Sequence, residues 1–296
     1  MKKYISIDIG GTEIKYGLLS ETGVFIKSAR TPAEAAKGAL CLMEKVEGII
    51  QDLLCADTAG IAVSTAGMVD PVRGRIIYAN ANIPGYTGME IKKRLESVFH
   101  LPCEVENDVC CAGIAEYASG AAAGSSPAVC LTVGTGIGGC LLTEGQVMHG
   151  AGYTAGSAGY LHMPGGRSFE ETASVTALVR RVAAQKQESA DVWDGRKIFA
   201  AIEKQDRICI RAVDEMTDAL GLGIADICYL LNPRVVVLGG GIMRQESYLL
   251  PRIRAAMDRY LVPAVADQTS LRAALHHNEA GMLGAFYHFL DRQRRT

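Results

Sequence analysis

The chain has 296 residues, of which 49% are hydrophobic and 21% charged, a composition that allows a globular protein to bury a sizeable core. A formal net charge of −2 provides no overall basic field to recruit nucleic acid. No run reaches the roughly 18 apolar residues of a membrane span, and Asp8 interrupts an N-terminal apolar stretch that is too short for a signal peptide.

The first predicted elements form a three-stranded meander. Residues 4–8 read as a strand with β-branched residues at alternate positions, a glycine turn follows, and strands return over 14–19 and 24–26. The same strand–glycine turn–strand pattern recurs over 128–142. Two such units, each with a threonine in its turn, indicate a duplicated architecture, although so short a pattern can also recur by chance.

Helices and buried strands are predicted between and after these two units. Before residue 120 we expect helices over 32–54, 89–99 and 109–117, and strands over 60–64 and 103–106. In the second half we expect a core strand over 234–238 and helices over 169–187, 194–201, 208–231, 247–260 (interrupted near Pro251) and 281–294. The expected division is an N-terminal α/β domain over 1–115, completed by the C-terminal helix 281–296, and a C-terminal α/β domain over 116–280.

A carboxylate, Asp8, closes the first predicted strand and is followed by Gly10, Gly11 and Thr12. Glycines allow close approach of the backbone to a ligand, and successive N–H groups can cradle phosphate oxygens. A carboxylate beside them can hold Mg²⁺, directly or through water. The segment indicates a metal–phosphate site, with a plain hairpin turn and a chance aspartate as the alternative.

The second glycine turn, residues 134–139, matches the dinucleotide G-x-G-x-x-G fingerprint only in part. A strand is predicted after it where the fingerprint needs a helix, which argues against a Rossmann fold. Two facing glycine–threonine hairpins fit an ATP phosphate clamp better. A third turn, around Gly240, follows the valine-rich strand and is expected to accommodate adenine and ribose, with a helix-entry turn as the alternative.

Asn107 and Asp108 lie where a predicted strand passes into a helix. A carboxylate at the C-terminal end of such a strand occupies the ligand-binding edge of an α/β sheet and can accept a proton from a substrate hydroxyl. Local sequence favours the alternative of a helix N-cap, and the pair can serve both roles.

Taken together, these motifs resemble the ROK family of sugar kinases and sugar-responsive repressors over nearly the whole chain. The matching segments occur in the family's order and span residues 8–12, 64–70, 82–86, 106–108, 134–139 and 232–241, with Glu116 as the helix glutamate. The resemblance implies an α/β fold of the two-domain, actin-like ATPase (ribonuclease H-like) type, with ATP in an interdomain cleft.

The resemblance also implies a role for each matching residue. Asp108 is the expected catalytic base. The expected sugar-binding residues are Gly67, Asn82, Asn107, Ser157, Tyr160 and Glu170. The expected ATP- and phosphate-binding residues are Asp8, Gly10, Gly11, Thr12, Lys15, Thr135, Gly136 and Gly240. Asp8 is also expected to position Mg²⁺.

The chain departs from the family pattern on the sugar side. Many members carry Gly-Glu-x-Gly-His, where this chain has Ser157 and Tyr160 in place of the Glu and the His. The family's cysteine-rich zinc motif is missing from residues 165–170, so no zinc is expected, and nearby His162 is interpreted as structural. This pattern resembles the branch that contains β-glucoside kinases and some N-acetylmannosamine-kinase-like proteins. Loss of the Glu near C1–C2 of the sugar is compatible with a substituted anomeric position.

The predicted function is therefore ATP-dependent phosphorylation of a hexose or hexoside hydroxyl at O6, with glucose or a β-glucoside as acceptor. N-acetylmannosamine or another hexose is the alternative substrate. A repressor is disfavoured because the phosphate motif begins at Asp8, leaving no room for a DNA-binding domain, and because Asp108 is present. A catalytically weak sugar sensor remains the third interpretation.

The expected partners are a small-molecule sugar and a second copy of the chain in a homodimer, without nucleic acid or membrane. Nine cysteines lie mainly in apolar contexts and form no C-x-x-C pair. This pattern predicts reduced, buried thiols in a cytoplasmic protein.

Overall fold

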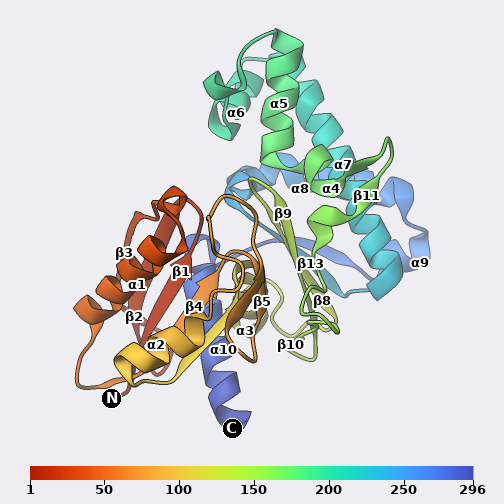
Figure 1. The fold of residues 1–296 in the computed structure, drawn as a ribbon. Helices are drawn as coiled ribbons and strands as arrows, with labels where there is room; N and C mark the ends of the chain where they lie inside the picture. Colours follow the sequence, from red (N-terminus) through yellow and green to blue (C-terminus); the bar gives the residue numbers. More distant parts are fainter. Residues whose placement is uncertain (296) are drawn as a thin grey trace. The chain divides into compact units, whose positions relative to one another are not determined.

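The computed structural model describes residues 1–295, which divide into two compact units (Figure 1). Unit 1 comprises residues 1–118, 149–155 and 278–295, and unit 2 comprises Ser119–Met148 and Gly156–His277. The fold is of the actin-like ATPase type, as the sequence predicts.

Unit 1 is built on a five-stranded sheet in the order β3-β2-β1-β4-β7. Its strands are β1 (Lys3–Ile9), β2 (Glu13–Ser20), β3 (Phe25–Pro32), β4 (Thr58–Thr65) and β7 (Cys103–Asn107). The first three strands form the predicted antiparallel meander, and β4 and β7 continue parallel to β1. A hairpin of β5 (Met68–Asp70) and β6 (Arg75–Tyr78) follows β4.

Alternation along β1 sends its side chains to two different cores. Ile5 and Ile7 pack with residues of α1, whereas Tyr4 packs with residues of α10 on the opposite face. The helices of unit 1 are α1 (Ala39–Leu53), α2 (Ile91–Phe99), α3 (Asp108–Ser119) and α10 (Ala280–Arg295). The C-terminal helix therefore completes the core of the N-terminal sheet.

Unit 2 has its own five-stranded sheet, in the order β10-β9-β8-β13-β14. Its strands are β8 (Ala128–Val133), β9 (Ile137–Thr143), β10 (Gln146–Val147), β13 (Val235–Gly239) and β14 (Ser270–Ala273). Here too an antiparallel meander is extended by two parallel strands. The two sheets share one topology, in agreement with the duplication predicted from the repeated glycine-turn units.

Long helices cover one face of the second sheet. The elements that follow β10 are the hairpin β11 (His162–Met163) and β12 (Arg167–Ser168), then α4 (Phe169–Ala173), α5 (Val175–Lys186), α6 (Gly195–Glu203), α7 (Arg207–Leu231), α8 (Glu246–Tyr260) and α9 (Pro263–Ala266). Short 3₁₀ turns occupy Ala35–Lys37, Ala158–Tyr160, Ala190–Val192, Gly241–Gln245 and His277–Glu279. Leu131 and Val236 of the sheet share one hydrophobic core with Leu220 of α7 and Met257 of α8.

Three predicted helices need correction. The helix expected over 169–187 is two helices, because Ser174 is extended and its hydroxyl caps α5 by accepting the N–H of Ala177. The helix expected from residue 32 begins only at Ala39, because β3 extends to Pro32. The interruption predicted near Pro251 is wrong: α8 runs through it, and burial of its apolar face against α7 outweighs one lost backbone hydrogen bond.

The cysteines are all free thiols, and seven of the nine are buried. Cys41 is exposed and Cys55 half-buried, so the prediction of buried thiols fails at these two positions. Across residues 1–295, every helix is too short or too polar to span a bilayer.

Candidate active site

Three parallel strands of unit 1 carry polar side chains to one edge of its sheet. In the register of β1, β4 and β7, Asp8 pairs with Ser64, and Ser64 pairs with Glu106. Asp108 follows β7 directly and begins α3. The Ser64 hydroxyl donates a hydrogen bond of 2.7 Å to Asp8 Oδ1. Residues distant in sequence are thus assembled at the C-terminal ends of parallel strands, where α/β sheets bind ligands.

Asn107 is the N-cap of α3, because its Oδ1 accepts hydrogen bonds from the N–H groups of Val109 and Cys110. Its Nδ2 donates to Gly67 O at 2.8 Å and to Asp108 Oδ1 at 2.9 Å. The capping role therefore belongs chiefly to Asn107, while the carboxyl of Asp108 lies in the first turn. The predicted sugar-side glycine and the predicted base are joined through this one amide.

The carboxyl of Asp108 titrates far from its ordinary range. Burial, followed by the neighbouring charge of Asp8, raises the pKa of Asp108 to about 7. Hydrogen bonds from Val109 and Asn107 act in the opposite direction and are outweighed. A carboxyl with a pKa near neutrality is well matched to accepting a proton from a hydroxyl at physiological pH.

The first predicted phosphate turn lies between β1 and β2. The N–H of Gly10 donates to Glu13 O at 3.0 Å and closes the turn, while Gly11 and Thr12 are exposed. Lys15 pairs with Asp8 across the hairpin, and its Nζ lies 3.4 Å from Asp8 Oδ2. A carboxylate, an ammonium group and free backbone surface thus gather at one turn.

Asn82 is exposed on the loop between β6 and α2, where its N–H donates to Asn80 Oδ1 at 3.1 Å. Buried Tyr86 ties this loop to the end of β4, since its hydroxyl lies 2.6 Å from Thr65 Oγ1. The loop is thereby held at the strand end that precedes Gly67.

The second glycine turn joins β8 to β9 within unit 2, so the strand predicted to follow it is confirmed. The start of α5 holds this turn. The N–H of Val175 donates to Gly134 O at 2.9 Å, and the Thr176 hydroxyl donates to Thr135 O at 2.7 Å. The N–H of Gly134 also donates to Gly136 O at 3.0 Å, so the turn is held by its own backbone as well as by the start of α5.

Glu170 lies against this glycine turn. A methyl group on Gly136 would come within 2.5 Å of Glu170 Oε2, and one on Gly159 within 3.1 Å. Ser157 precedes the short helix that contains Gly159, and Tyr160, the last residue of that helix, is 57% exposed. Within unit 2 the structure therefore brings together residues predicted for sugar and for phosphate.

A cavity of about 760 Å³ opens beside the second glycine turn. Apolar side chains line much of it, namely Val175, Val179, Trp193, Phe199 and Ile242. Gly134, Thr135 and Gly241 also line it, and Gly240 stands next to it with φ +98°. A Cβ at Gly240 would lie 2.2 Å from Val133 O, so this turn requires glycine for both its conformation and its packing.

The Trp193–Lys197 segment belongs to none of the motifs recognised in the sequence, yet Trp193, Asp194 and Arg196 line this cavity. Trp193 is the only tryptophan of the chain, and Asp194 caps α6 by accepting the N–H of Lys197. The only sequence signal for a role of this segment is a single tryptophan immediately before a helix cap. The sequence does not show that Trp193 lies beside the second glycine turn, because the two segments come together only in the folded protein.

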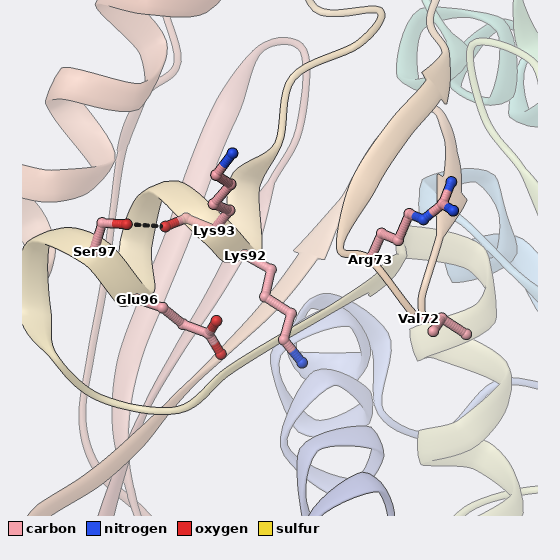
Figure 2. A pocket seen from close by; sticks show the side chains of 6 residues that line it. All are labelled: Val72, Arg73, Lys92, Lys93, Glu96 and Ser97. Atoms are coloured by element: carbon pink, nitrogen blue, oxygen red, sulfur yellow. Dashed lines mark hydrogen bonds between the residues drawn. The ribbon is translucent and has the colours of Figure 1, made fainter.

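A smaller hollow of about 340 Å³ on unit 1 contains none of the predicted site residues. Figure 2 shows its lining side chains, Val72, Arg73, Lys92, Lys93, Glu96 and Ser97. Lys92 extends from the hollow to an ion pair of 2.8 Å with Glu104. Within residues 1–295, no group of three or more His, Cys, Asp or Glu side chains is arranged to hold a metal ion.

Comparison with known proteins identifies the family. The ROK family matches residues 4–292. A β-glucoside kinase from Klebsiella pneumoniae is 32% identical over 294 residues, covering 97% of this chain and 96% of that protein.

Two solved structures are similar along almost their whole length. A Listeria monocytogenes protein, described as a proposed N-acetylmannosamine kinase, has a TM-score of 0.89 and 29% identity, covering 98% of this chain and 99% of that chain. A ROK family glucokinase from Streptomyces griseus, solved with glucose and AMPPNP, has a TM-score of 0.84 and 26% identity with the same coverage. The chain therefore belongs to the ROK family, as an ATP-dependent sugar kinase.

Proposed function

We propose that this kinase transfers the γ-phosphoryl group of ATP to O6 of a hexose or hexoside, with glucose or a β-glucoside as the preferred acceptor. The observation that carries the proposal is Asp108, a carboxyl with a pKa of about 7 at the C-terminal edge of the sheet, oriented by Asn107 and close to Asp8. An ionised carboxylate at this position accepts the proton of the sugar hydroxyl. The hydroxyl oxygen attacks the γ-phosphorus at the same time, and ADP departs.

The other residues act by positioning, because phosphoryl transfer needs little covalent help from a protein. Asn107 orients the Asp108 carboxyl and contacts the sugar, together with Gly67 and Asn82. In unit 2, Glu170 is the retained acidic contact to the sugar, with Ser157 and Tyr160 beside it. These assignments rest on the hydrogen bonds of Asn107 and on the contact of Glu170 with the second glycine turn.

Phosphate groups bind at the two glycine turns. Gly10, Gly11 and Thr12 serve one turn, with Lys15 as a nearby cation. Thr135 and Gly136 serve the other, and Gly240 borders the cavity that accepts the adenosine.

Asp8 fits a magnesium ion bound largely through water and phosphate oxygens, because kinase sites hold Mg²⁺ with only one or two carboxylates. Ser64 orients one oxygen of Asp8 and leaves the other facing Lys15. When bound, Mg²⁺ neutralises charge on the phosphates.

Two observations support a β-substituted acceptor. Ser157 is smaller than the glutamate that many family members carry, which leaves room near C1–C2 of the sugar. The 32% identical relative is a β-glucoside kinase. We therefore expect cellobiose or methyl β-glucoside to be better acceptors than free glucose. A strong preference for free glucose would contradict the β-substituted acceptor and leave glucose as the acceptor.

N-acetylmannosamine is the second candidate substrate, since the similar Listeria structure carries that description. A coupled ADP-release assay with Mg-ATP decides between them, using glucose, mannose, N-acetylmannosamine, cellobiose and methyl β-glucoside as acceptors. ³¹P NMR of the product identifies the phosphorylated oxygen. The homodimer and the cytoplasmic location stay predictions.

Asp108→Asn tests the base directly. We expect kcat to fall by at least about 10³-fold, because general-base catalysis and orientation are lost together. Asp52→Asn, at an exposed aspartate of α1, is the matched control and should retain full turnover. Retained turnover in Asp108→Asn would remove Asp108 as the base. Turnover of no sugar by the wild type, with sugar binding still measurable, would favour a sensor.

A further inference from the structure

Strand β7 places two glutamates on the face opposite its hydrophobic side chains. Cys103 and Val105 belong to the hydrophobic core, while Glu104 and Glu106 alternate with them and are also buried. Glu106 is only 1% exposed. A buried carboxylate is costly unless hydrogen bonds and opposite charge compensate it. Glu106 has no role in the phosphoryl transfer described above, so the partners that stabilise its buried carboxylate have to be identified.

The two carboxylate oxygens of Glu106 bind two different partners. Oε1 accepts the backbone N–H of Asn107 at 2.7 Å. Oε2 lies 2.7 Å from Nε2 of His149, and because a carboxylate only accepts, this nitrogen carries the proton. His288 of α10 faces the same oxygen at a longer distance, 3.8 Å. The shorter of the two distances makes His149 the close partner of Glu106. Burial lowers the pKa of His288 and so disfavours its charged form.

Each link in this series touches the next. His149 contacts Glu106, Glu106 receives the N–H of Asn107, and the Asn107 side chain donates to Asp108 Oδ1 at 2.9 Å. Asn107 Oδ1 also caps α3. A displacement of Glu106 is therefore passed to the residue that sets the orientation of the catalytic carboxyl.

His149 is the first residue of a short segment, His149–Ala155, that belongs to unit 1. The chain on both sides of this segment belongs to unit 2. Tyr153, from the same segment, packs edge-on against the His149 ring with centroids 6.1 Å apart. The ring is thus held between Glu106 and Tyr153.

We propose that His149 is a positioning residue of the phosphoryl-transfer site, which holds Asn107 and the carboxyl of Asp108 in their productive orientation through Glu106. The inference rests on the proposed role of Asp108. It adds a residue from a separate segment of the chain that acts through the side chain of Glu106.

The test compares His149→Met with His149→Gln. The two replacements have similar length and volume, but only glutamine can donate a hydrogen bond to Glu106. We expect His149→Met to lower kcat by about 10–100-fold, the range for misplaced catalytic groups, while KM for ATP and sugar changes by less than about threefold. His149→Gln should recover most of kcat. His162→Met, at an exposed histidine, is the control for loss of an imidazole and should match wild type.

A second measurement does not depend on turnover. Hydrogen exchange monitored by mass spectrometry reports the N–H groups of Asn107, Val109 and Cys110, which are bonded to the Glu106 and Asn107 side chains. We expect faster exchange in peptides that cover these amides in His149→Met, and wild-type exchange in His149→Gln.

A double-mutant cycle with Glu106→Gln completes the test. If His149 acts through Glu106, the loss of kcat in the double variant should be smaller than the product of the two single losses.

Several results would overturn the inference: wild-type kcat and exchange in His149→Met, equal losses in the Met and Gln variants, or fully multiplicative losses in the cycle. If the wild type phosphorylates no sugar, the proposed function fails, and unchanged exchange in His149→Met would then separately overturn the positioning role.

Discussion

The ionised form of Asp108 that the proposed base catalysis needs is also the form that lowers the stability of the folded protein. Its folded-state pKa of about 7 lies above the ordinary aspartate value of 3.8. The folded protein therefore holds this proton more tightly than the unfolded chain does. Between those two pH values, the free energy of unfolding must fall as pH rises, because ionisation places a charge in a half-buried site near Asp8.

Asp108→Asn should remove this cost, since an amide cannot ionise. We expect the variant to be more stable than wild type at pH 8, by on the order of 3 kcal/mol, with the difference shrinking as pH falls towards 4. Urea unfolding in EDTA at several pH values measures it, because bound magnesium would itself change the charge balance. A constant difference across the pH range would show that the Asp108 pKa is ordinary.

Trp193 offers a direct probe of nucleotide binding at the same scale. It is the only tryptophan and lines the cavity of unit 2, where Lys186 Nζ lies 5.2 Å from its ring centroid. We expect AMPPNP to change the intrinsic fluorescence saturably and sugar alone to leave it unchanged. Trp193→Ala should raise KM for ATP about tenfold, with a smaller effect on kcat. AMPPNP binding seen by calorimetry without a fluorescence change would place the nucleotide elsewhere.

At the scale of elements, the glycine turns distinguish a structural from a functional requirement. Gly240 has a positive φ and would bring a Cβ against Val133 O, so its fold already needs glycine. Gly11 has neither constraint, because a Cβ there would have no neighbour within 4 Å. The fold therefore tolerates a side chain at Gly11, and a glycine is needed there only if a ligand approaches the turn closely.

Gly11→Ala should therefore leave the melting temperature within about 2 °C of wild type while raising KM for Mg-ATP about tenfold, because the new methyl group meets the phosphates. Gly48→Ala is the matched control. It replaces another unobstructed glycine, inside α1, and should stabilise the protein by up to about 1 kcal/mol without changing KM. An unchanged KM in Gly11→Ala would separate this turn from phosphate binding.

Sequence patterns located these elements well where the signal is local. The strands around Asp8 and the strand-to-helix passage at Asn107 follow from hydrophobic alternation and turn chemistry. The break at Ser174 was missed, because an amphipathic pattern continues through it and only the N-cap bond marks the second helix. The unbroken α8 was missed because packing against α7 overrides the proline signal at Pro251.

At the scale of the whole molecule, unit 1 depends on the last helix of the chain. Phe286 of α10 is fully buried and packs edge-on against Tyr4 of β1, with centroids 5.3 Å apart. Ser6 also donates a hydrogen bond of 2.7 Å to Met282 O. The first strand and the last helix therefore form one core, and neither can bury its apolar face alone.

Phe286→Ala should destabilise unit 1 by about 3–5 kcal/mol, the usual cost of truncating a buried phenylalanine. Leu275→Ala, at a leucine that is 62% exposed, should change stability by less than about 0.5 kcal/mol. Urea unfolding followed by far-UV circular dichroism compares them. Equal midpoints for the two variants would mean that α10 contributes little to the core.

Local patterns in the sequence were enough to predict the duplicated meander, the strand-end carboxylates Asp8 and Asp108 and the glycine turns, because each depends on residues close together in the chain. The order of these motifs along the chain was enough to identify the family. Contacts between distant segments produce the raised pKa of Asp108, the position of Trp193 in the lining of the cavity, and the contact of His149 with Glu106. Burial, electrostatic coupling and cavity shape arise only when distant segments pack together, so no local pattern records them.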